Sequence, residues 1–404
     1  MKNSNINNSQ TQELFAQIIE GKNPDIHQFL IDGMSDLLNR AFVAERSIYL
    51  AGNGNVSNKA NGYSNRNINF GTSSIPISVP RDRNGDFYPA MLPKYSRNIG
   101  ENYTNILEGI ILNSKSFRSI SDMVKALSLP YSKEQVEIML NDLFEESKKF
   151  NSRQLVSDWA FVYVDAKVID MVEEAGSIKK AIHFTVVGVD MNCKKELLLS
   201  ITFFGSESLE MWKKVITNLK NRGLCRVLMF ITDDFSGLNK LLSQMLPNTD
   251  HQLCLVHLMR NLKGNLEKNL YEEFSNLMQE IYLCPSFESA YSKLSFFIEE
   301  KVKKDHSFYA NYLKERVNNY LAFTKYPQGL RPMIRTTNAV EGINNAIETT
   351  RRNSGGYFHS EREMAIKMKI IFDNLAKTKW LNPIPKFAAN LAQINHMFFE
   401  RFEG

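Results

Sequence analysis

The pattern of hydrophobic and polar positions divides the chain into a helical first part, a strand-rich middle and a helical last part. From Asp25 to about Tyr49, apolar residues recur every three or four positions, which predicts an amphipathic helix. Residues 51–99 are interrupted by many Gly, Asn, Ser and Pro residues, and this predicts loops with at most a small hairpin. We therefore expect an N-terminal helical and irregular region over residues 1–99.

Residues 100–152 show two helical patterns on either side of a tight turn. Spacings typical of helix-capping pairs begin at Ser119 and at Ser132, and the segment SLPY at 128–131 lies between them. Helix, turn and helix is the layout of a helix-turn-helix DNA-binding unit, although an ordinary helical hairpin gives the same pattern. We expect a DNA-binding domain here, with Lys133 as the early basic residue of the helix that would read bases.

The middle of the chain is dominated by strand patterns. Three runs rich in β-branched and aromatic residues predict a three-stranded meander: FVYVDAKVIDMV, AIHFTVVGVDM and KKELLLSITFF. A helix from about Ser206 to Arg222 follows, and then come the strand RVLMFITDD, the helix SGLNKLLSQML and the short strand QLCLVH. The order β-β-β-α-β-α-β is the layout of a ribonuclease-H-like domain, whose first part would span residues 153–257.

The last part of the chain reads as helix throughout. Residues 258–330 show no strand pattern, which predicts an all-helical insertion, and residues 331–404 would complete the core with further helices. The expected fold class is therefore α/β: a ribonuclease-H-like mixed sheet with an all-helical insertion, preceded by a helical DNA-binding region.

Composition and charge indicate where the protein works more clearly than what it does. The 404 residues carry 43% hydrophobic residues and a net charge of +5, which permits a nucleic-acid partner without requiring one. The four cysteines are spaced too widely for a disulfide framework. No apolar run approaches the roughly 20 residues that span a bilayer, and the N-terminus lacks a signal-peptide core. We expect a cytoplasmic protein with no membrane partner.

Three carboxylates occupy positions that suit a site. Asp165 lies within the strand segment YVDAK, where a buried charge is costly unless it is paired or binds metal. Asp233 and Asp234 close an apolar strand, and the carboxyl ends of strands form the usual ligand crevice of an open α/β sheet. Glu341 lies in the first turn of a later helix. Together they could hold two divalent cations, Mg²⁺ or Mn²⁺, for phosphoryl transfer.

Each of these carboxylates also has an ordinary interpretation. Asp165 could pair with Lys167 or with an arginine elsewhere. Asp233 or its neighbour Asp234 could cap the next helix or shape a turn. Glu341 could form a capping box with Asn338. The spacing of the three residues does not decide between these interpretations.

Six sequence blocks, taken in order, point to a family. They are NGYSNR (61–66) with VPRDRNGDF (79–87), YVDAK (163–167), the helix that bears Trp212 and ends in NRG (221–223), ITDDFSGL (231–238), QLCLVHLMRN (252–261) and TTNAVEGIN (336–344). Over roughly residues 60–380 the chain resembles the Mutator-type transposases of bacterial insertion sequences. The resemblance implies metal-dependent cutting at transposon ends and joining to target DNA. The implied catalytic and metal-binding residues are Asp165, Asp233 and Glu341, with two Mg²⁺ or Mn²⁺ ions.

The resemblance also implies partners. These are double-stranded DNA, both the terminal inverted repeats and the target, and further copies of the chain in a homodimer or higher oligomer. The candidate DNA contacts, which would bind phosphate and not read sequence, are Arg260, Arg335, Asn338, Arg351, Arg352, Arg81 and Arg83. A solvated surface position is the ordinary interpretation of any one of these residues.

Two features of the resemblance leave roles open. Asp234 stands where the family usually has Gly, so either Asp233 or Asp234 could bind metal, although alignment to the following Gly237 favours Asp233. Cys254 and His257 match the family's Cys-x-x-His feature, which is half of a zinc site without a matching second pair. We expect them to support the active site and do not expect zinc; a buried cysteine and a hydrogen-bonded histidine are the alternative.

Two other functions fit parts of the same sequence. A ribonuclease-H-like nuclease or resolvase would cut DNA without joining it. A decayed transposase would only bind DNA, but the three filled acidic positions argue against that function.

Overall fold

The structure is a computed structural model of the chain. It describes residues 16, 19–20, 25–52, 58–70, 73–90, 92, 103–127, 129, 131–173 and 175–404, without the side chains of residues 69, 70, 103, 104 and 341. The chain divides into two compact units, one formed by residues 1–110 and 120–133 and the other by residues 111–119 and 134–404.

The first unit contains a helix, α2 (Ile26–Gly52), packed on a hairpin of β1 (Ala60–Phe70) and β2 (Ser73–Asp82). The helix confirms the prediction for residues 25–49. The strands are longer than the small hairpin that we expected, because Ile75 and Ile77 alternate with more exposed residues and pack with Phe42 in a core of their own.

Three helices follow: α3 (Tyr103–Asn113), α4 (Phe117–Ala126) and α5 (Lys133–Ser152). Helix α5 begins directly after Ser132, as predicted, but α4 begins two residues before Ser119. The Ser119 hydroxyl instead donates a hydrogen bond to the carbonyl of Ser116 (2.7 Å). The boundary between the two units runs through this segment, and the helix-turn-helix arrangement stays a prediction.

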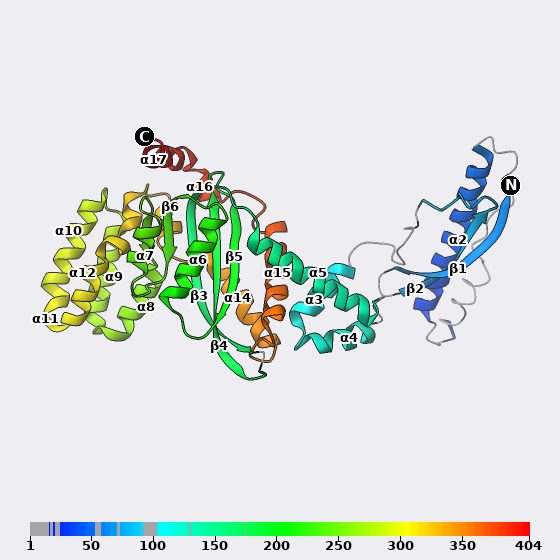
Figure 1. Ribbon diagram of the computed structural model, residues 1–404, viewed down its shortest axis with the longest axis horizontal. Coiled ribbons are helices and arrows are strands. Elements are labelled where there is room, and N and C mark those ends of the chain that lie inside the picture. Colours follow the sequence, from blue (N-terminus) through cyan, green and yellow to red (C-terminus); the bar gives the residue numbers. More distant parts are fainter. Residues whose placement is uncertain are drawn as a thin grey trace. The chain divides into compact units, whose positions relative to one another are not determined.

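The second unit is built on a five-stranded mixed sheet (Figure 1). Its strands are β3 (Asp158–Val172), β4 (Ile178–Asp190), β5 (Lys195–Phe204), β6 (Arg226–Thr232) and β7 (Asp250–Leu253). Their order in the sheet is β5-β4-β3-β6-β7. Strands β3, β4 and β5 pair antiparallel, whereas β6 runs parallel to β3 and β7 parallel to β6. The predicted mixed sheet is therefore confirmed.

The central strand β3 is covered on both faces. Phe161 and Tyr163 pack into one core, Val162 and Val164 pack into another, and all four are fully buried. A strand buried on both faces needs no polar alternation, which explains its continuous apolar run. Because side chains alternate along a strand, Asp165 lies on the same face as Phe161 and Tyr163.

Helices cover the two faces of this sheet. In Figure 1, α6 (Leu209–Asn221) and α7 (Leu238–Met245) lie in front of the strands and contribute to one core. Residues of α14 (Asn338–Asn353) and α15 (Glu361–Lys377) join the other core. Helix α6 is capped by Ser208 and is followed by Gly223 in a left-handed conformation (φ 109°), where glycine has no steric penalty.

Between β7 and α14 the chain forms only helices. They are α8 (Leu255–Asn265), α9 (Lys268–Tyr282), α10 (Phe287–Phe297), the π-helix η1 (Ile298–Val302), α11 (Lys303–Asp305), α12 (Ser307–Tyr320), the 3₁₀-helix η2 (Ala322–Lys325) and α13 (Arg331–Ile334). The predicted strand QLCLVH was wrong beyond Leu253. Leu255, Leu258 and Leu262 have helical spacing and pack into the core, so the chain turns into a helix at Cys254.

The chain closes with α16 (Pro385–Ala388) and α17 (Leu391–Phe402). Just before and after the end of α17, two residues bind the start of β6. Arg401 donates to the carbonyl of Leu228 (2.7 Å), and Glu403 pairs with Arg226 (3.1 Å). No helix in the described part of the chain has the length and apolar character needed to cross a membrane.

Candidate active site

The parallel pairing of β3 and β6 brings two aspartates together. Tyr163 is the register partner of Ile231, and each aspartate follows two residues later, Asp165 within β3 and Asp233 just beyond β6. Side chains two positions apart along a strand lie on the same face of the sheet, and Asp165 and Asp233 are both two positions beyond a pair of register partners. Both side chains therefore reach the same side of the sheet. They line a cleft of about 320 Å³ together with Lys167, Val256, His257, Arg260, Thr337, Asn338 and Asn344, among others.

Asp165 is held by α14. It is 7% exposed, and the Asn344 amide donates a hydrogen bond to its Oδ2 atom (2.7 Å). Lys167 is not its partner, because the Lys167 ammonium donates to the Asn344 carbonyl (3.1 Å) and pairs with Glu348 (3.5 Å). Among the described residues, no lysine or arginine forms an ion pair with Asp165. The ordinary interpretation of Asp165 as the partner of Lys167 is therefore wrong.

The electrostatics of the cleft suit a cation. Burial, and then the charge of Asp233, raise the pKa of Asp165, against the opposing hydrogen bond from Asn344. Two carboxylates that face one cleft repel each other, and a divalent cation between them would relieve this repulsion. Carboxylate oxygens are also the ligands that Mg²⁺ and Mn²⁺ prefer. The side chains of Asp165 and Asp233 therefore fit the implied metal.

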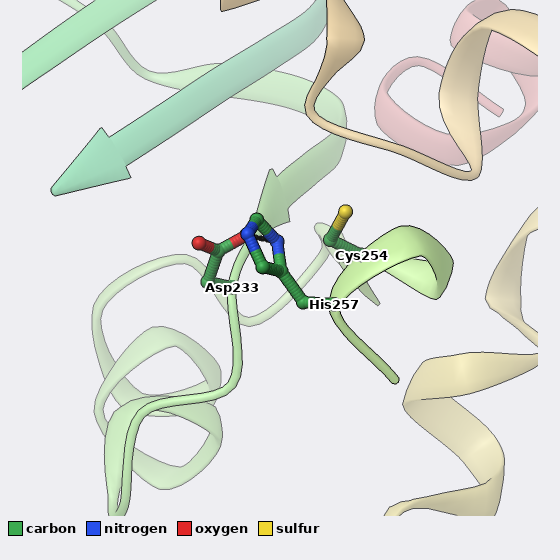
Figure 2. Close-up of side chains that lie close together, drawn as sticks. All are labelled: Asp233, Cys254 and His257. Carbon is green, nitrogen blue, oxygen red and sulfur yellow. Dashed lines mark ion pairs between the residues drawn. The ribbon is translucent and has the colours of Figure 1, made fainter. Parts of the chain in front are cut away.

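His257 lies against Asp233 in the first turn of α8. Its Nδ1 atom is 2.6 Å from Oδ1 of Asp233, and Figure 2 shows this ion pair beside Cys254. The contact with Asp233, followed by that with Cys254, raises the pKa of His257 to about 10. At neutral pH the ring is therefore an imidazolium that balances part of the negative charge of the cleft.

Cys254 joins this group from the N-terminal cap of α8. Burial alone would raise the pKa of its thiol, but hydrogen bonds with His257 and Thr337 outweigh burial and lower the pKa. The backbone N–H and the hydroxyl of Thr337 both lie 3.4 Å from the Cys254 sulfur. Cys254 therefore connects the start of α8 to the start of α14.

The same three side chains could in principle form a metal site of another kind. Asp233, Cys254 and His257 offer one oxygen, one sulfur and one nitrogen atom within 4.8 Å of one another. A structural zinc site has four protein ligands, and no fourth Cys, His, Asp or Glu from the described part of the chain joins this group. The arrangement favours Cys254 and His257 as a support for the Asp233 carboxylate.

Asp234 faces away from the other aspartates. Its Oδ2 atom accepts hydrogen bonds from the Arg316 guanidinium (2.8 Å) and the Tyr312 hydroxyl (2.7 Å), both on α12. It is not among the residues that line the cleft, whereas Asp233 is. Of the two neighbours, Asp233 is the one placed with Asp165.

Glu341 falls in the first turn of α14, as predicted, but its side chain lies outside the described residues. The capping box with Asn338 is wrong, because Asn338 is the first residue of the helix and Thr337 is its cap. One turn after Glu341, Asn344 contacts Asp165. The helix backbone therefore runs beside the cleft, and the role of Glu341 as a third ligand stays a prediction.

Sequence reasoning missed Glu207, which precedes α6. Burial raises its pKa, a hydrogen bond from the Trp212 indole (2.7 Å) opposes this, and the charges of Asp233 and Asp165 raise the pKa further. Glu207 therefore belongs to the same acidic neighbourhood. Its signal in the sequence was a glutamate beside a helix cap, five residues before a tryptophan, which indicated only a helix start.

The predicted DNA-contacting residues do not lie together. Arg260 and Asn338 line the cleft, and both are exposed. Arg351 and Arg352 instead pair with Glu348 (2.7 and 3.2 Å).

Four further candidates lie elsewhere. Arg335 lies over the Tyr282 ring, 4.8 Å from its centre. Arg81, Arg83 and Lys133 belong to the first unit, and Arg81 lines a pocket there with Arg66.

The fold and this cleft define a class: mixed α/β proteins with an acidic site beside the central parallel strands. Within this class, the chain belongs to the Mutator family of transposases, because the family model "Transposase, Mutator family" matches residues 6–381. The resemblance noted in the sequence is thereby confirmed. Transposases are enzymes that process DNA, and the cleft is the candidate place for that chemistry.

Known transposases align with most of the chain. The transposase for insertion sequence element ISRM3 of Rhizobium meliloti is 26% identical over 403 residues, 97% of this chain and 98% of the relative. The transposase for insertion sequence element IS1201 of Lactobacillus helveticus is 27% identical over 334 residues, 80% of this chain and 88% of the relative. Among solved structures, the Drosophila P element transposase strand transfer complex aligns with 77% of this chain at 10% identity, with a TM-score of 0.28.

Proposed function

We propose that this protein is the transposase of an insertion sequence. It binds the terminal inverted repeats of its element, cleaves a phosphodiester to free a 3′-hydroxyl and joins that hydroxyl to target DNA. The observation that carries the proposal is the convergence of Asp165 and Asp233, from neighbouring parallel strands, in one cleft of a Mutator-family chain. The names of the relatives, all insertion-sequence transposases where the element is stated, support the same function.

The catalytic core in this proposal is ribonuclease-H-like. Three antiparallel strands continued by two parallel ones, in the order β5-β4-β3-β6-β7, support this assignment. Residues 258–330 are the helical insertion between the second aspartate and the glutamate helix. Their uninterrupted helices support that role.

Asp165, Asp233 and Glu341 are the residues that would hold two divalent ions, Mg²⁺ or Mn²⁺. Such ions, when bound, supply activation of the attacking oxygen and neutralisation of charge on the phosphate and the leaving oxygen. The burial of Asp165, which forms no ion pair with a lysine or arginine among the described residues, supports this ligand set.

The chain's own groups orient these ligands and the DNA. Asn344 fixes Asp165, and His257 fixes Asp233 through the 2.6 Å contact. Arg260 provides a guanidinium at the cleft, and such a fork suits a phosphate that must be held in one position. Lys167 adds a second positive charge to the same wall.

DNA binding involves more of the chain than the cleft. Residues 100–152 are the proposed helix-turn-helix domain, and Lys133, Arg81 and Arg83 are proposed contacts in the first unit. Arg335, Arg351 and Arg352 are proposed contacts in the second. Because two transposon ends must be brought together, the working form is a homodimer or a higher oligomer.

The test uses purified protein, labelled transposon-end DNA and Mg²⁺. Asp165→Asn should abolish cleavage while the protein still folds and binds DNA. The matched control is Asp170→Asn, which changes a carboxylate on the same strand that pairs with Lys180 (2.8 Å) and does not line the cleft. Cleavage by Asp165→Asn at the wild-type rate would refute the proposed site.

The reaction products separate the remaining functions. Joined strand-transfer products identify a transposase, whereas nicks alone identify a nuclease or resolvase. DNA binding with no cleavage of any end sequence, with or without metal, would identify a protein that only binds DNA.

A further inference from the structure

Asp234 is bound by side chains of α12, which belongs to the helices between β7 and α14, called the helical segment below. Besides the two hydrogen bonds from Arg316 and Tyr312, the Arg316 guanidinium lies 4.3 Å from the centre of the Tyr312 ring. The Tyr312 hydroxyl is also 2.7 Å from that of Tyr320, which is 1% exposed. One carboxylate is thus bound by two side chains of α12, and Tyr320 holds one of these two in place. Asp234 and Arg316, the two charged partners, are each only 23% exposed.

A second connection joins α12 to the same loop. The Thr232 hydroxyl donates to the carbonyl of Asp233 (2.7 Å) and contacts the His251 ring (2.8 Å). The Asn319 amide, near the end of α12, donates to the carbonyl of His251 (3.1 Å) and to the Asn239 side chain (3.0 Å). The residue before Asp233 and the residue after it are therefore both connected to α12.

The far side of the loop is held as well. Phe235 packs against the ring of Trp212 in α6, with 6.4 Å between the ring centres. With Thr232, Asp234 and Phe235 all engaged, little conformational freedom is left to the backbone of Asp233. Its carboxylate is the one group in this stretch that faces the cleft.

We propose that α12 positions the Asp233 carboxylate, with Asp234 as the positioning residue through which it acts. This inference rests on the proposed function, in which Asp233 binds a divalent ion. Arg316 and Tyr312 fix the side chain of Asp234, and this fixes the orientation of the preceding residue. The helical segment thus sets how well the cleft binds metal, although it contributes no ligand itself.

The test measures metal binding directly, by the loss of the free Mn²⁺ signal in electron paramagnetic resonance. The variants are Asp234→Asn, Arg316→Gln and the two combined. The matched control is Lys325→Gln, because Lys325 also joins the helical segment to the sheet, through Asp250 (2.7 Å), away from the cleft. Thermal unfolding of every variant measures its stability, and cleavage is followed against Mg²⁺ concentration.

Asp234→Asn should weaken Mn²⁺ binding about tenfold, because the loss of a group that orients a metal ligand typically weakens binding by this much. The Mg²⁺ concentration needed for half-maximal cleavage should rise by the same factor. Saturating Mg²⁺ should restore the maximal rate. The combined variant should lose no more affinity than Asp234→Asn alone, and Lys325→Gln should bind Mn²⁺ normally even where its stability falls.

Two results would overturn the inference alone. Unchanged Mn²⁺ affinity in Asp234→Asn would show that α12 does not act on the site. Complete loss of binding that excess metal does not restore, as expected for Asp233→Asn, would show that Asp234 is itself a ligand. Wild-type protein that binds no Mn²⁺ and cleaves no DNA would refute the proposed function, and the inference with it.

Discussion

Lys367 and Glu363, one turn apart in α15, form an ion pair that is almost completely buried. Their charged atoms are 2.7 Å apart, and the two side chains are 0% and 2% exposed. Lys367 also donates to the carbonyl of Ser114 (3.0 Å) and to the hydroxyl of Ser354 (2.6 Å). The pair therefore connects α15 to the end of α14, the helix that carries Glu341.

Lys367→Met removes the cation but retains a long side chain. Glu363 is then left as a buried charge without its partner, and such losses cost about 3–5 kcal/mol in the free energy of unfolding. Glu363→Gln added to Lys367→Met removes the second charge while it keeps an oxygen for the backbone N–H of His359. The double variant should therefore regain most of the lost stability, because an intact buried pair contributes little net stability.

The measurement is urea unfolding, followed by the fluorescence of the buried Trp159 and Trp212. The control is Lys214→Met, which breaks an exposed pair with Glu210 at the same helical spacing and should leave the free energy of unfolding almost unchanged. A loss below about 1 kcal/mol in Lys367→Met, or a double variant no more stable than the single, would contradict the expected cost of an unpaired buried charge.

Three further outcomes are expected. Gly188→Ala places a methyl group 2.5 Å from the Trp159 ring and should lower the free energy of unfolding by about 1–3 kcal/mol or more; unchanged urea unfolding would contradict the close packing. The hydrogen bond from Arg351 is the main cause that lowers the pKa of Glu348 from its usual 4.5 to about 2. The ionised carboxylate therefore stabilises the fold above about pH 4.5, and this stabilisation is lost as the pH falls toward 2. Glu348→Gln should therefore melt below wild type at neutral pH and converge with it in acid, and a constant difference would contradict this. Arg260→Ala should weaken binding to any duplex and reduce the slope of log affinity against log salt by about 0.9, whereas an unchanged slope would exclude a phosphate contact.

The order of strands and helices along the chain was predictable because a strand buried on both faces has a continuous apolar sequence. The runs around Phe161 and Phe230 are apolar throughout, and helix α6 has a clear period and a Ser208 cap. Errors fell where two patterns meet. At Cys254 a four-residue strand passes directly into a helix, and an apolar run that short does not distinguish the two.

The sequence placed Asp165 and Asp233 at positions that line one cleft, but it did not show which groups contact them. Asn344 contacts Asp165 across 179 positions of sequence, and Arg316 contacts Asp234 across 82. Hydrophobic periodicity indicates which side chains are buried, but it does not indicate which polar groups meet after the chain has folded. The same limit explains why Glu207 was missed and why Lys167 was considered as the partner of Asp165.

The contact of Arg401 with the carbonyl of Leu228 has a consequence for the chain while it is being synthesised. The two residues are 173 positions apart, so at typical translation speeds β6 leaves the ribosome roughly ten to thirty seconds before Arg401 exists. During this interval Asp250 lacks its Arg401 partner (2.9 Å), and Arg226 lacks Glu403. A nascent chain therefore carries both aspartates of the cleft before the strand that leads to Asp233 is fully secured. Ribosome-bound and prematurely terminated chains should accordingly be more easily digested by proteases at β6 than the finished protein.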